Sequence, residues 1–172
     1  MSQPKSVRRE AAVLIVENHV PMRQVIRLYI ERSFPELSII EAPDGATALK
    51  YLEAHYPSLV LIDINLPDGD GLDLMRDVLK QSPCTFVVAI SIDTNVDVIE
   101  QVRAVGAVEF IGKDKLFKLL LPLVGAAVTL TNWTKDLESH CAITDESALY
   151  EGHRAEHLLE TGVLRDGQDC RV

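Results

Sequence analysis

The chain has 172 residues, of which 47% are hydrophobic, and it carries a formal net charge of -9 at pH 7. This length predicts one domain with a buried core, and this hydrophobic content excludes a disordered chain. The negative charge argues against a nucleic-acid-binding surface, which needs clustered Lys and Arg side chains, so we expect no nucleic-acid partner.

The cysteines and the hydrophobic runs predict a cytoplasmic protein without a membrane partner. The three cysteines are too scattered for a disulfide framework or a set of metal ligands, as expected in a reducing compartment. Residues 1–10 lack the hydrophobic core of a signal peptide, and we expect them to form a flexible arm. The longest hydrophobic run, 116–130, contains Lys, Pro and Gly and is shorter than the ~20 residues that a membrane span needs, so we expect a helix packed against protein.

The first half of the chain alternates between patterns typical of strands and of helices. Residues 11–16 form a continuous hydrophobic run, which predicts a buried central strand. Pro21 suits the first turn of a helix, and hydrophobic residues recur at helical spacing as far as Phe34. Residues 37–41 are less hydrophobic, as in an edge strand, and Asp44 can cap the helix that follows.

The second half contains three more pairs of a strand and a helix. Residues 59–63 read Leu-Val-Leu-Ile-Asp, and four aliphatic residues in a row predict a strand that is buried on both faces. A loop rich in Pro, Gly and Asp follows this strand. The further predicted elements are a helix ending at Ser82, a strand at 86–90, a helix ending at Gly106, a strand at 108–111 and a final helix from near Lys115. Asp93 or Thr94 can cap the helix that Gly106 ends.

The alternation of short strands and helices predicts the α/β class, with parallel strands and with helices on both faces of one sheet. In such a sheet the carboxyl ends of the strands meet at one rim, where ligands collect. The polar residues expected at this rim are Glu17, Asn18, Asp63, Ser91 and Lys113. Burying such side chains without partners is costly, so their convergence predicts a functional site. Three of them also have an ordinary interpretation: Asp63 as a helix cap, Ser91 as a turn hydroxyl and Lys113 as a solvated lysine.

When these residues are taken in order, the chain resembles the receiver domain of bacterial two-component response regulators over residues 11–131. The matching features are Glu17-Asn18 after the first strand, Asp63 with Leu-Pro-Asp-Gly-Asp-Gly shortly after it, Ser91 after the fourth strand, and Phe110 three residues before Lys113. The resemblance implies a flavodoxin-like (βα)5 doubly wound parallel sheet with strand order 2-1-3-4-5. It also implies that Asp63 accepts a phosphoryl group from the phosphohistidine of a sensor histidine kinase or of a histidine phosphotransfer protein.

The resemblance further implies a Mg²⁺ cofactor and gives the site residues their roles. The implied Mg²⁺ ligands are Glu17, Asn18, Asp63 and the main-chain carbonyl of Asn65. Oxygen ligands suit a hard cation, which neutralises charge as an aspartyl oxygen approaches an anionic phosphoryl group. The implied catalytic residues are Asp63, Ser91 and Lys113. Asp63 is the phosphoacceptor, Lys113 supplies a positive charge to a phosphoryl oxygen, and the Ser91 hydroxyl donates a hydrogen bond to another.

Ser91 and Phe110 are implied to switch a protein-interaction face, because the hydroxyl moves toward the phosphoryl group and the ring turns into the space that it leaves. Phe110 can equally be an ordinary core residue. Asn65 and Asp93 take positions that tune hydrolysis of the acyl phosphate. The implied output is contact with a downstream protein target, and the fourth helix, fifth strand and fifth helix form the expected face of a homodimer.

Two departures from the family pattern leave an alternative open. The family usually has a second acid where the neutral Asn18 stands, so we predict weak Mg²⁺ binding. The family usually has a small residue where the branched Ile92 stands, which narrows access to Asp63. The alternative is a pseudo-receiver that is never phosphorylated and acts as a constitutive interaction module. A third hypothesis, a phosphatase of the haloacid-dehalogenase type, is disfavoured because that type needs an acid in place of Asn65. The resemblance to receivers implies a phosphoacceptor signalling domain, with no enzyme activity beyond self-phosphorylation and self-dephosphorylation.

Residues 132–172 lie outside the resemblance and form a C-terminal extension that we expect to be partly helical or mobile. They are too few for a helix-turn-helix output domain and contain no basic recognition helix. Residues 147–161 predict one modest amphipathic helix. His153 and His157 are spaced for a metal ion, although exposed polar residues are the better interpretation. The hydrophobic run 116–130 predicts either dimerisation or burial under the extension.

Overall fold

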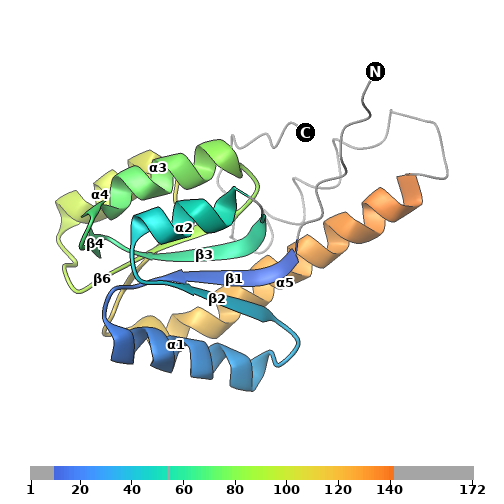
Figure 1. Ribbon diagram of the computed structural model, residues 1–172, viewed down its shortest axis with the longest axis horizontal. Coiled ribbons are helices and arrows are strands. Elements are labelled where there is room, and N and C mark those ends of the chain that lie inside the picture. Colours follow the sequence, from blue (N-terminus) through green and yellow to red (C-terminus); the bar gives the residue numbers. More distant parts are fainter. Residues whose placement is uncertain (1–9, 54, 142–172) are drawn as a thin grey trace. The chain divides into compact units, whose positions relative to one another are not determined.

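The computed structural model describes the backbone of residues 10–53 and 55–141 and the side chains of residues 11–53 and 55–131 (Figure 1). The strands are β1 (Glu10–Val16), β2 (Ser38–Ala42), β3 (Pro57–Asp63), β4 (Asn65–Leu66), β5 (Gly69–Asp70), β6 (Phe86–Ser91) and β7 (Glu109–Gly112). The helices are α1 (Val20–Ser33), α2 (Gly45–Leu52), α3 (Gly71–Gln81), α4 (Val96–Val105) and α5 (Leu116–Cys141).

The chain divides into two compact units, Met1–Asn132 and Trp133–Val172, and the fold below is that of the first unit. The described part of the second unit is the end of α5, which continues to Cys141. Three expectations lie outside the described residues: the arm before β1, the helix at 147–161, and the paired histidines within that helix.

Five strands pair in parallel, in the order β2-β1-β3-β6-β7. Because β6 and β7 are the fourth and fifth of these strands along the chain, the structure confirms the predicted order 2-1-3-4-5. β2 lies at an edge of the sheet, as its weaker hydrophobicity predicts. Every residue of the central β3 is buried, as its aliphatic run predicts.

The segment after β3 is a short hairpin rather than the predicted loop. β4 and β5 pair antiparallel, with Asn65 opposite Asp70 and Leu66 opposite Gly69. Strands of two residues are too short to show a hydrophobic alternation, so the sequence pattern does not predict them. The hairpin joins the end of β3 directly to the start of α3, so it lies beside the predicted phosphoacceptor.

Helices cover both faces of the sheet, and each face has its own hydrophobic core (Figure 1). On one face, Val13 and Ile15 of β1 pack with buried residues of α1 and α5. On the other face, Leu14 and Val16 of β1 pack with buried residues of α2, α3 and α4. Successive residues of β1 therefore alternate between two cores, as expected of a strand that is covered on both sides.

The hydrophobic run 116–130 lies in α5 and packs against α1. Leu116 and Leu120, which are one turn apart, are fully buried. The hydroxyl of Tyr29 on α1 donates a hydrogen bond of 2.8 Å to the carbonyl of Phe117, and the two rings meet edge to face. The structure thus confirms a helix packed against protein. No helix in the described part of the chain is long and hydrophobic enough to cross a membrane.

The helix ends follow the predictions except at the start of α4. Asp44 caps α2 by accepting a hydrogen bond of 2.7 Å from a first-turn amide, and Gly106 ends α4 in the left-handed region at a φ of 100°. The predicted cap of α4 by Asp93 or Thr94 is wrong, because the N-cap is Asn95 and its side chain makes no capping bond. The Asp93 carboxylate instead accepts a hydrogen bond of 3.0 Å from the Asn95 amide, in a turn that precedes the helix.

Candidate functional site

The carboxyl ends of four strands bring polar side chains to one rim of the sheet. Glu17 follows β1, Asp63 ends β3, Ser91 ends β6 and Lys113 follows β7. Glu17, Asp63 and Ser91 are 0%, 3% and 1% exposed, respectively. Polar side chains at this depth need partners within the protein, and Lys113 is such a partner for both Glu17 and Asp63.

The ammonium of Lys113 is the shared partner of two carboxylates. Its Nζ atom donates a hydrogen bond of 2.7 Å to Oδ2 of Asp63. The same Nζ atom lies 2.7 Å from Oε2 of Glu17, in an ion pair whose angles fall outside those of a hydrogen bond. Two buried carboxylates therefore face one ammonium group.

The pKa of Lys113 reflects this position. Burial disfavours the charged form and lowers the pKa, but the close contacts of the ammonium with the Asp63 and Glu17 carboxylates, and the charges of those carboxylates, outweigh burial, so the pKa rises above its ordinary value of 10.5. Lys113 is therefore fully charged at neutral pH. It provides a fixed positive charge beside Asp63.

Short turns hold both carboxylates in place. The main-chain amide of His19 donates a hydrogen bond to Oε1 of Glu17, and that of Asn65 donates one to Oδ1 of Asp63, each at 3.0 Å. In both cases the amide lies two residues after the acid, which is the pattern of a side-chain turn. Each carboxylate therefore has one oxygen held by the chain and the other directed to Lys113.

The remaining oxygen of Glu17 fits a ligand of Mg²⁺. Mg²⁺ in proteins is usually held by one or two carboxylates and keeps several waters. Oε2 of Glu17 is buried and meets the Lys113 ammonium as an ion pair without a hydrogen bond, and Asp63 contacts the same ammonium, so the two carboxylates are close enough to share one cation. Among the side chains that the structure describes, no three His, Cys, Asp or Glu residues gather closely enough to bind a metal.

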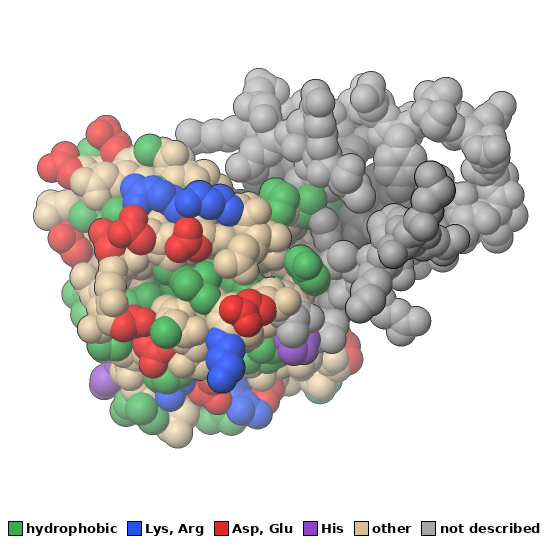
Figure 2. Space-filling view, turned by 45° about the horizontal axis from the view of Figure 1, so that its top comes forward, with side chains coloured by type: hydrophobic (Ala, Val, Ile, Leu, Met, Phe, Trp, Pro, Cys, Tyr) green, Lys and Arg blue, Asp and Glu red, His purple; other side chains and the backbone are tan. Residues whose placement is uncertain are grey.

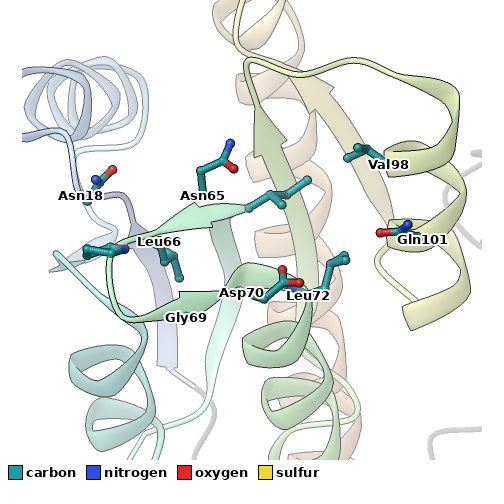
Figure 3. Close-up of a pocket in the computed structure, with 10 residues that line it drawn as sticks. Asn18, Asn65, Leu66, Gly69, Asp70, Leu72, Val98 and Gln101 are labelled. Carbon is teal, nitrogen blue, oxygen red and sulfur yellow. The ribbon is translucent and has the colours of Figure 1, made fainter.

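Asn18 and Asn65 are exposed and lie on the wall of a pocket beside the rim (Figure 3). The pocket has a volume of about 460 Å³ and is lined also by the β4–β5 hairpin, the start of α3, and two residues of α4. Neither asparagine adds a charge. Because both side chains are exposed, this side of the site is open to solvent. Because both are neutral, it carries less negative charge than two acidic side chains would give it.

The predicted switch, tuning and access residues lie on β6, β7 and the loop before α4. Oγ of Ser91 accepts a hydrogen bond of 3.0 Å from the amide of Asp93, a contact that does not use the hydroxyl proton. Ile92 is 80% exposed, so most of its side chain lies in solvent. Phe110 is half-buried and packs against the core beneath α2, α3 and α4. The roles of these residues stay predictions.

Two residues that hold the loops of the site have no signal in the sequence. Arg23 on α1 donates a hydrogen bond of 2.6 Å to the main-chain carbonyl of Glu17. Asp68 in the hairpin accepts hydrogen bonds of 3.0 and 2.9 Å from the amides of Gly45 and Ala46 at the start of α2, and these bonds hold the pKa of Asp68 below its ordinary value. Both contacts join a side chain to the backbone of a distant element, which residue spacing does not predict.

Known proteins share this sequence pattern. A family model described as the response regulator receiver domain matches residues 13–123. A protein-glutamate methylesterase/protein-glutamine glutaminase 2 of Rhodospirillum rubrum is 30% identical, over 90% of this chain but only 39% of its own length. The transcriptional regulatory protein PdtaR of Mycobacterium tuberculosis is 29% identical, over 87% of this chain and 73% of its own length. The chain therefore spans less than half of the methylesterase.

Solved structures share the fold. A response regulator receiver domain protein (CheY-like) from Methanospirillum hungatei has a TM-score of 0.65 at 20% identity, over 73% of this chain and 98% of its own. The signal receiver domain of a Luxo repressor protein from Vibrio parahaemolyticus has a TM-score of 0.66 at 24% identity, over 75% of this chain and 98% of its own. Because the family model covers more than half of the sequence and the strand order agrees with it, the chain belongs to the response regulator receiver family, which acts in two-component signal transduction.

Proposed function

We propose that Asp63 accepts a phosphoryl group from the phosphohistidine of a histidine kinase or of a histidine phosphotransfer protein. The observation that carries this proposal is the buried Asp63 carboxylate, held 2.7 Å from the Lys113 ammonium at the rim of the sheet. The modified domain then presents an altered surface to a downstream protein. The chain itself is a signalling domain and has no activity on a separate substrate.

In the transfer, one carboxylate oxygen of Asp63 forms a bond to phosphorus while the bond from phosphorus to the donor's histidine nitrogen breaks. The electron pair of the broken bond stays on the imidazole, which takes up a proton from solvent. Negative charges approach one another in this step, so positive charge aimed at the phosphoryl oxygens lowers the barrier. Lys113 provides such a charge with little rearrangement, because Asp63 and Glu17 already hold its ammonium.

The proposed Mg²⁺ site combines two carboxylates with neutral oxygens. When bound, Mg²⁺ supplies further positive charge to the phosphoryl oxygens. Glu17 supports this assignment because its Oε2 atom is buried and is contacted by Lys113 as an ion pair without a hydrogen bond, which a cation can join. The proposed ligands are Glu17, Asn18, Asp63 and the main-chain carbonyl of Asn65.

The remaining rim residues would sense and time the modification. Ser91 would turn its hydroxyl proton to a phosphoryl oxygen, and Phe110 would follow into the space that is left, altering the face formed by α4, β7 and α5. Asn65 and Asp93 would orient the water that hydrolyses the acyl phosphate, and Ile92 would slow its entry.

Replacing Asp63 with asparagine is expected to abolish phosphoryl uptake, because an amide is not a nucleophile toward phosphorus. The full chain is incubated with acetyl phosphate and Mg²⁺, and mass spectrometry of the intact chain and of its peptides follows the reaction. We expect one added phosphoryl group, on the peptide that contains Asp63, in the wild type and in the control Asp73→Asn, which removes an exposed carboxylate of α3. A wild type that takes up nothing contradicts the proposal and favours the pseudo-receiver, which Asn18 and Ile92 support.

Replacing Asn18 with aspartate is expected to tighten Mg²⁺ binding by about tenfold. At about 4 Å in water, one added negative charge attracts a divalent cation by about 2 kcal/mol, and about 1.4 kcal/mol corresponds to a tenfold change. Isothermal titration calorimetry with Mg²⁺ measures this affinity. Asn95→Asp is the matched control, because it places the same charge on an exposed residue at the start of α4. Equal affinities in the wild type and Asn18→Asp reject the assignment of Asn18 as a weak ligand.

The surface supports a protein partner rather than a nucleic acid. On the face of the described residues shown in Figure 2, acidic side chains stand among the basic ones, which form no broad patch. The net charge of -9 has the same sign as a phosphate backbone. We therefore include a downstream protein target in the proposal. A homodimer through α4, β7 and α5 and a cytoplasmic location are included from the family resemblance.

A further inference from the structure

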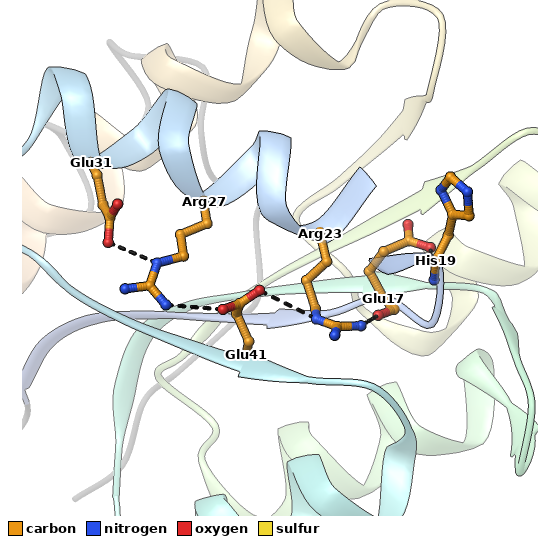
Figure 4. Close-up of polar contacts among 6 residues, drawn as sticks. All are labelled: Glu17, His19, Arg23, Arg27, Glu31 and Glu41. Atoms are coloured by element: carbon orange, nitrogen blue, oxygen red, sulfur yellow. Dashed lines mark hydrogen bonds and ion pairs between the residues drawn. The ribbon is translucent and has the colours of Figure 1, made fainter. Parts of the chain in front are cut away.

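Four side chains of alternating charge join α1 to the edge strand β2 next to the acid site (Figure 4). We call Glu31, Arg27, Glu41 and Arg23 the ion-pair ladder. Arg27 lies between Glu31 at 2.8 Å and Glu41 at 3.0 Å, and Arg23 lies 3.3 Å from the other oxygen of Glu41. Arg23 then donates a hydrogen bond of 2.6 Å from Nη1 to the main-chain oxygen of Glu17. The ladder therefore ends on a residue of the site.

From Arg27 onward, the ladder becomes more buried toward the site. The side chain of Arg27 is 43% exposed, that of Glu41 is 25% exposed and that of Arg23 is 13% exposed. Water screens exposed ion pairs, so they contribute little, whereas a buried guanidinium needs partners. Within the described residues, Nε of Arg23 meets Glu41 as an ion pair without a hydrogen bond. The bond from Nη1 to Glu17 is therefore the directional contact of this guanidinium.

The carbonyl that Arg23 contacts lies where β1 leaves the sheet. The amide of Glu17 still donates a hydrogen bond of 3.1 Å to Ala42 of β2, and Arg23 binds the carbonyl of the same residue. This carbonyl and the amide of Asn18 belong to one planar peptide unit. Arg23 therefore sets the orientation of the plane from which the side chains of Glu17 and Asn18 depart.

We propose that Arg23 is a positioning residue for the cation and phosphoryl site, because it fixes the peptide between Glu17 and Asn18 while Glu41 holds its guanidinium. The inference rests on the proposed function, in which both residues of that peptide are Mg²⁺ ligands. Figure 4 shows the guanidinium meeting the main-chain oxygen of Glu17, whereas the carboxylate extends toward His19. Arg23 thus acts through the backbone, without touching the reacting atoms.

The direction in which Mg²⁺ affinity changes when the Arg23 guanidinium is removed distinguishes a positioning role from a purely electrostatic one. Removing a positive charge near a cation site tightens Mg²⁺ binding by electrostatics alone. Releasing the peptide weakens binding, because the ligands then spend time in orientations that do not converge. A lower affinity after loss of the Arg23 guanidinium therefore has a positional cause.

The test compares Arg23→Met with Arg27→Met in the full chain. Both variants remove one guanidinium of the ladder from α1, but only the first removes the contact with Glu17. By isothermal titration calorimetry, we expect Mg²⁺ affinity to fall by about tenfold in Arg23→Met, as for other residues that orient metal ligands. Arg27→Met keeps the wild-type affinity or binds Mg²⁺ slightly more tightly. Uptake from acetyl phosphate at subsaturating Mg²⁺ slows by a similar factor in Arg23→Met alone.

A second variant covers the case in which Arg23→Met does not fold, as judged by circular dichroism. Arg23→Lys keeps the charge but lacks the planar fork that reaches Glu17 and Glu41 together, so we expect an affinity about threefold below the wild type. Equal affinities across these variants, or tighter binding without Arg23, overturn the inference alone if the wild type is phosphorylated on Asp63. A wild type that takes up no phosphoryl group overturns the proposed function and this inference together.

Discussion

Replacing Lys113 with methionine is expected to lower the free energy of unfolding by about 3 kcal/mol without divalent cations. The variant leaves two carboxylates facing one another in the protein, since the side chains of Glu17 and Asp63 are 0% and 5% exposed. Removing one partner from a buried group of charges costs more than the pair itself contributes, because the other charges stay buried without compensation. Phosphoryl uptake should slow by at least about a hundredfold, the usual effect of losing one preorganised electrostatic contact.

Urea unfolding in EDTA and in Mg²⁺ measures the first effect. Lys115→Met is the matched control, because Lys115 is exposed two residues along the chain and its loss should change stability by no more than about 0.5 kcal/mol. Added Mg²⁺ should restore part of the stability of Lys113→Met, since the cation replaces the lost positive charge. Equal losses in both variants contradict the assigned role of Lys113.

The contribution of Lys113 to the free energy of unfolding is expected to fall at alkaline pH. The pKa of Lys113 in the folded chain is raised above 10.5, so its contribution to stability is complete below the unfolded pKa and is lost as pH rises through the folded pKa. Urea unfolding of the wild type between pH 7 and 11 should therefore show constant support from Lys113 up to about pH 10 and a decline above it. Lys113→Met should lack this component of the decline.

Replacing Gly71 with alanine is expected to destabilise the fold by about 2 to 3 kcal/mol. A Cβ atom at Gly71 would lie 2.5 Å from the carbonyl oxygen of Asp63 and 2.7 Å from Cα of Ile64. Both atoms are backbone, so relief requires the end of β3 to move, and Asp63 moves with it. The amide of Gly71 also donates a hydrogen bond of 2.9 Å to Ile64, which keeps the start of α3 against this strand. Phosphoryl uptake should therefore fall together with stability.

Gly69→Ala provides the control for this substitution in the same hairpin. A Cβ atom at Gly69 meets nothing within 4 Å, and the residue does not have a positive φ. Its replacement should change the free energy of unfolding by no more than about 0.5 kcal/mol. Urea unfolding and mass-detected uptake, measured side by side, test the pair. Similar behaviour of the two variants rules out the close backbone contact as the cause.

The sequence predicts the sheet because each strand carries its own local signal. The continuous hydrophobic runs at 11–16 and 59–63 correspond to the central strands β1 and β3, and the weaker run at 37–41 corresponds to the edge strand β2. Where the signal is only a few residues long, prediction fails. The β4–β5 hairpin has strands too short to show a period, and Asp93 uses its carboxylate in a turn rather than as a cap of α4.

The site is predictable to the extent that it consists of strand ends. Parallel strands bring Glu17, Asp63 and Lys113 to one rim whatever their side chains do, and the structure places these three in contact. Contacts between a side chain and a distant backbone depend on how helices pack on the sheet, so Arg23 and Asp68 are invisible to residue spacing. Which residues bind Mg²⁺ or time hydrolysis stays a prediction from the family resemblance.

Each central strand contributes alternate side chains to both hydrophobic cores, so neither layer of helices is independent of the other. Detaching α1 and α5 would expose one face of β1 and β3 to water, at a free-energy cost of about 25 cal/mol for each Å² of apolar surface. Heating should therefore melt both layers in a single cooperative transition. Below the melting temperature, we expect local unfolding to be confined to the loops at the rim, which are the parts that must admit a phosphodonor.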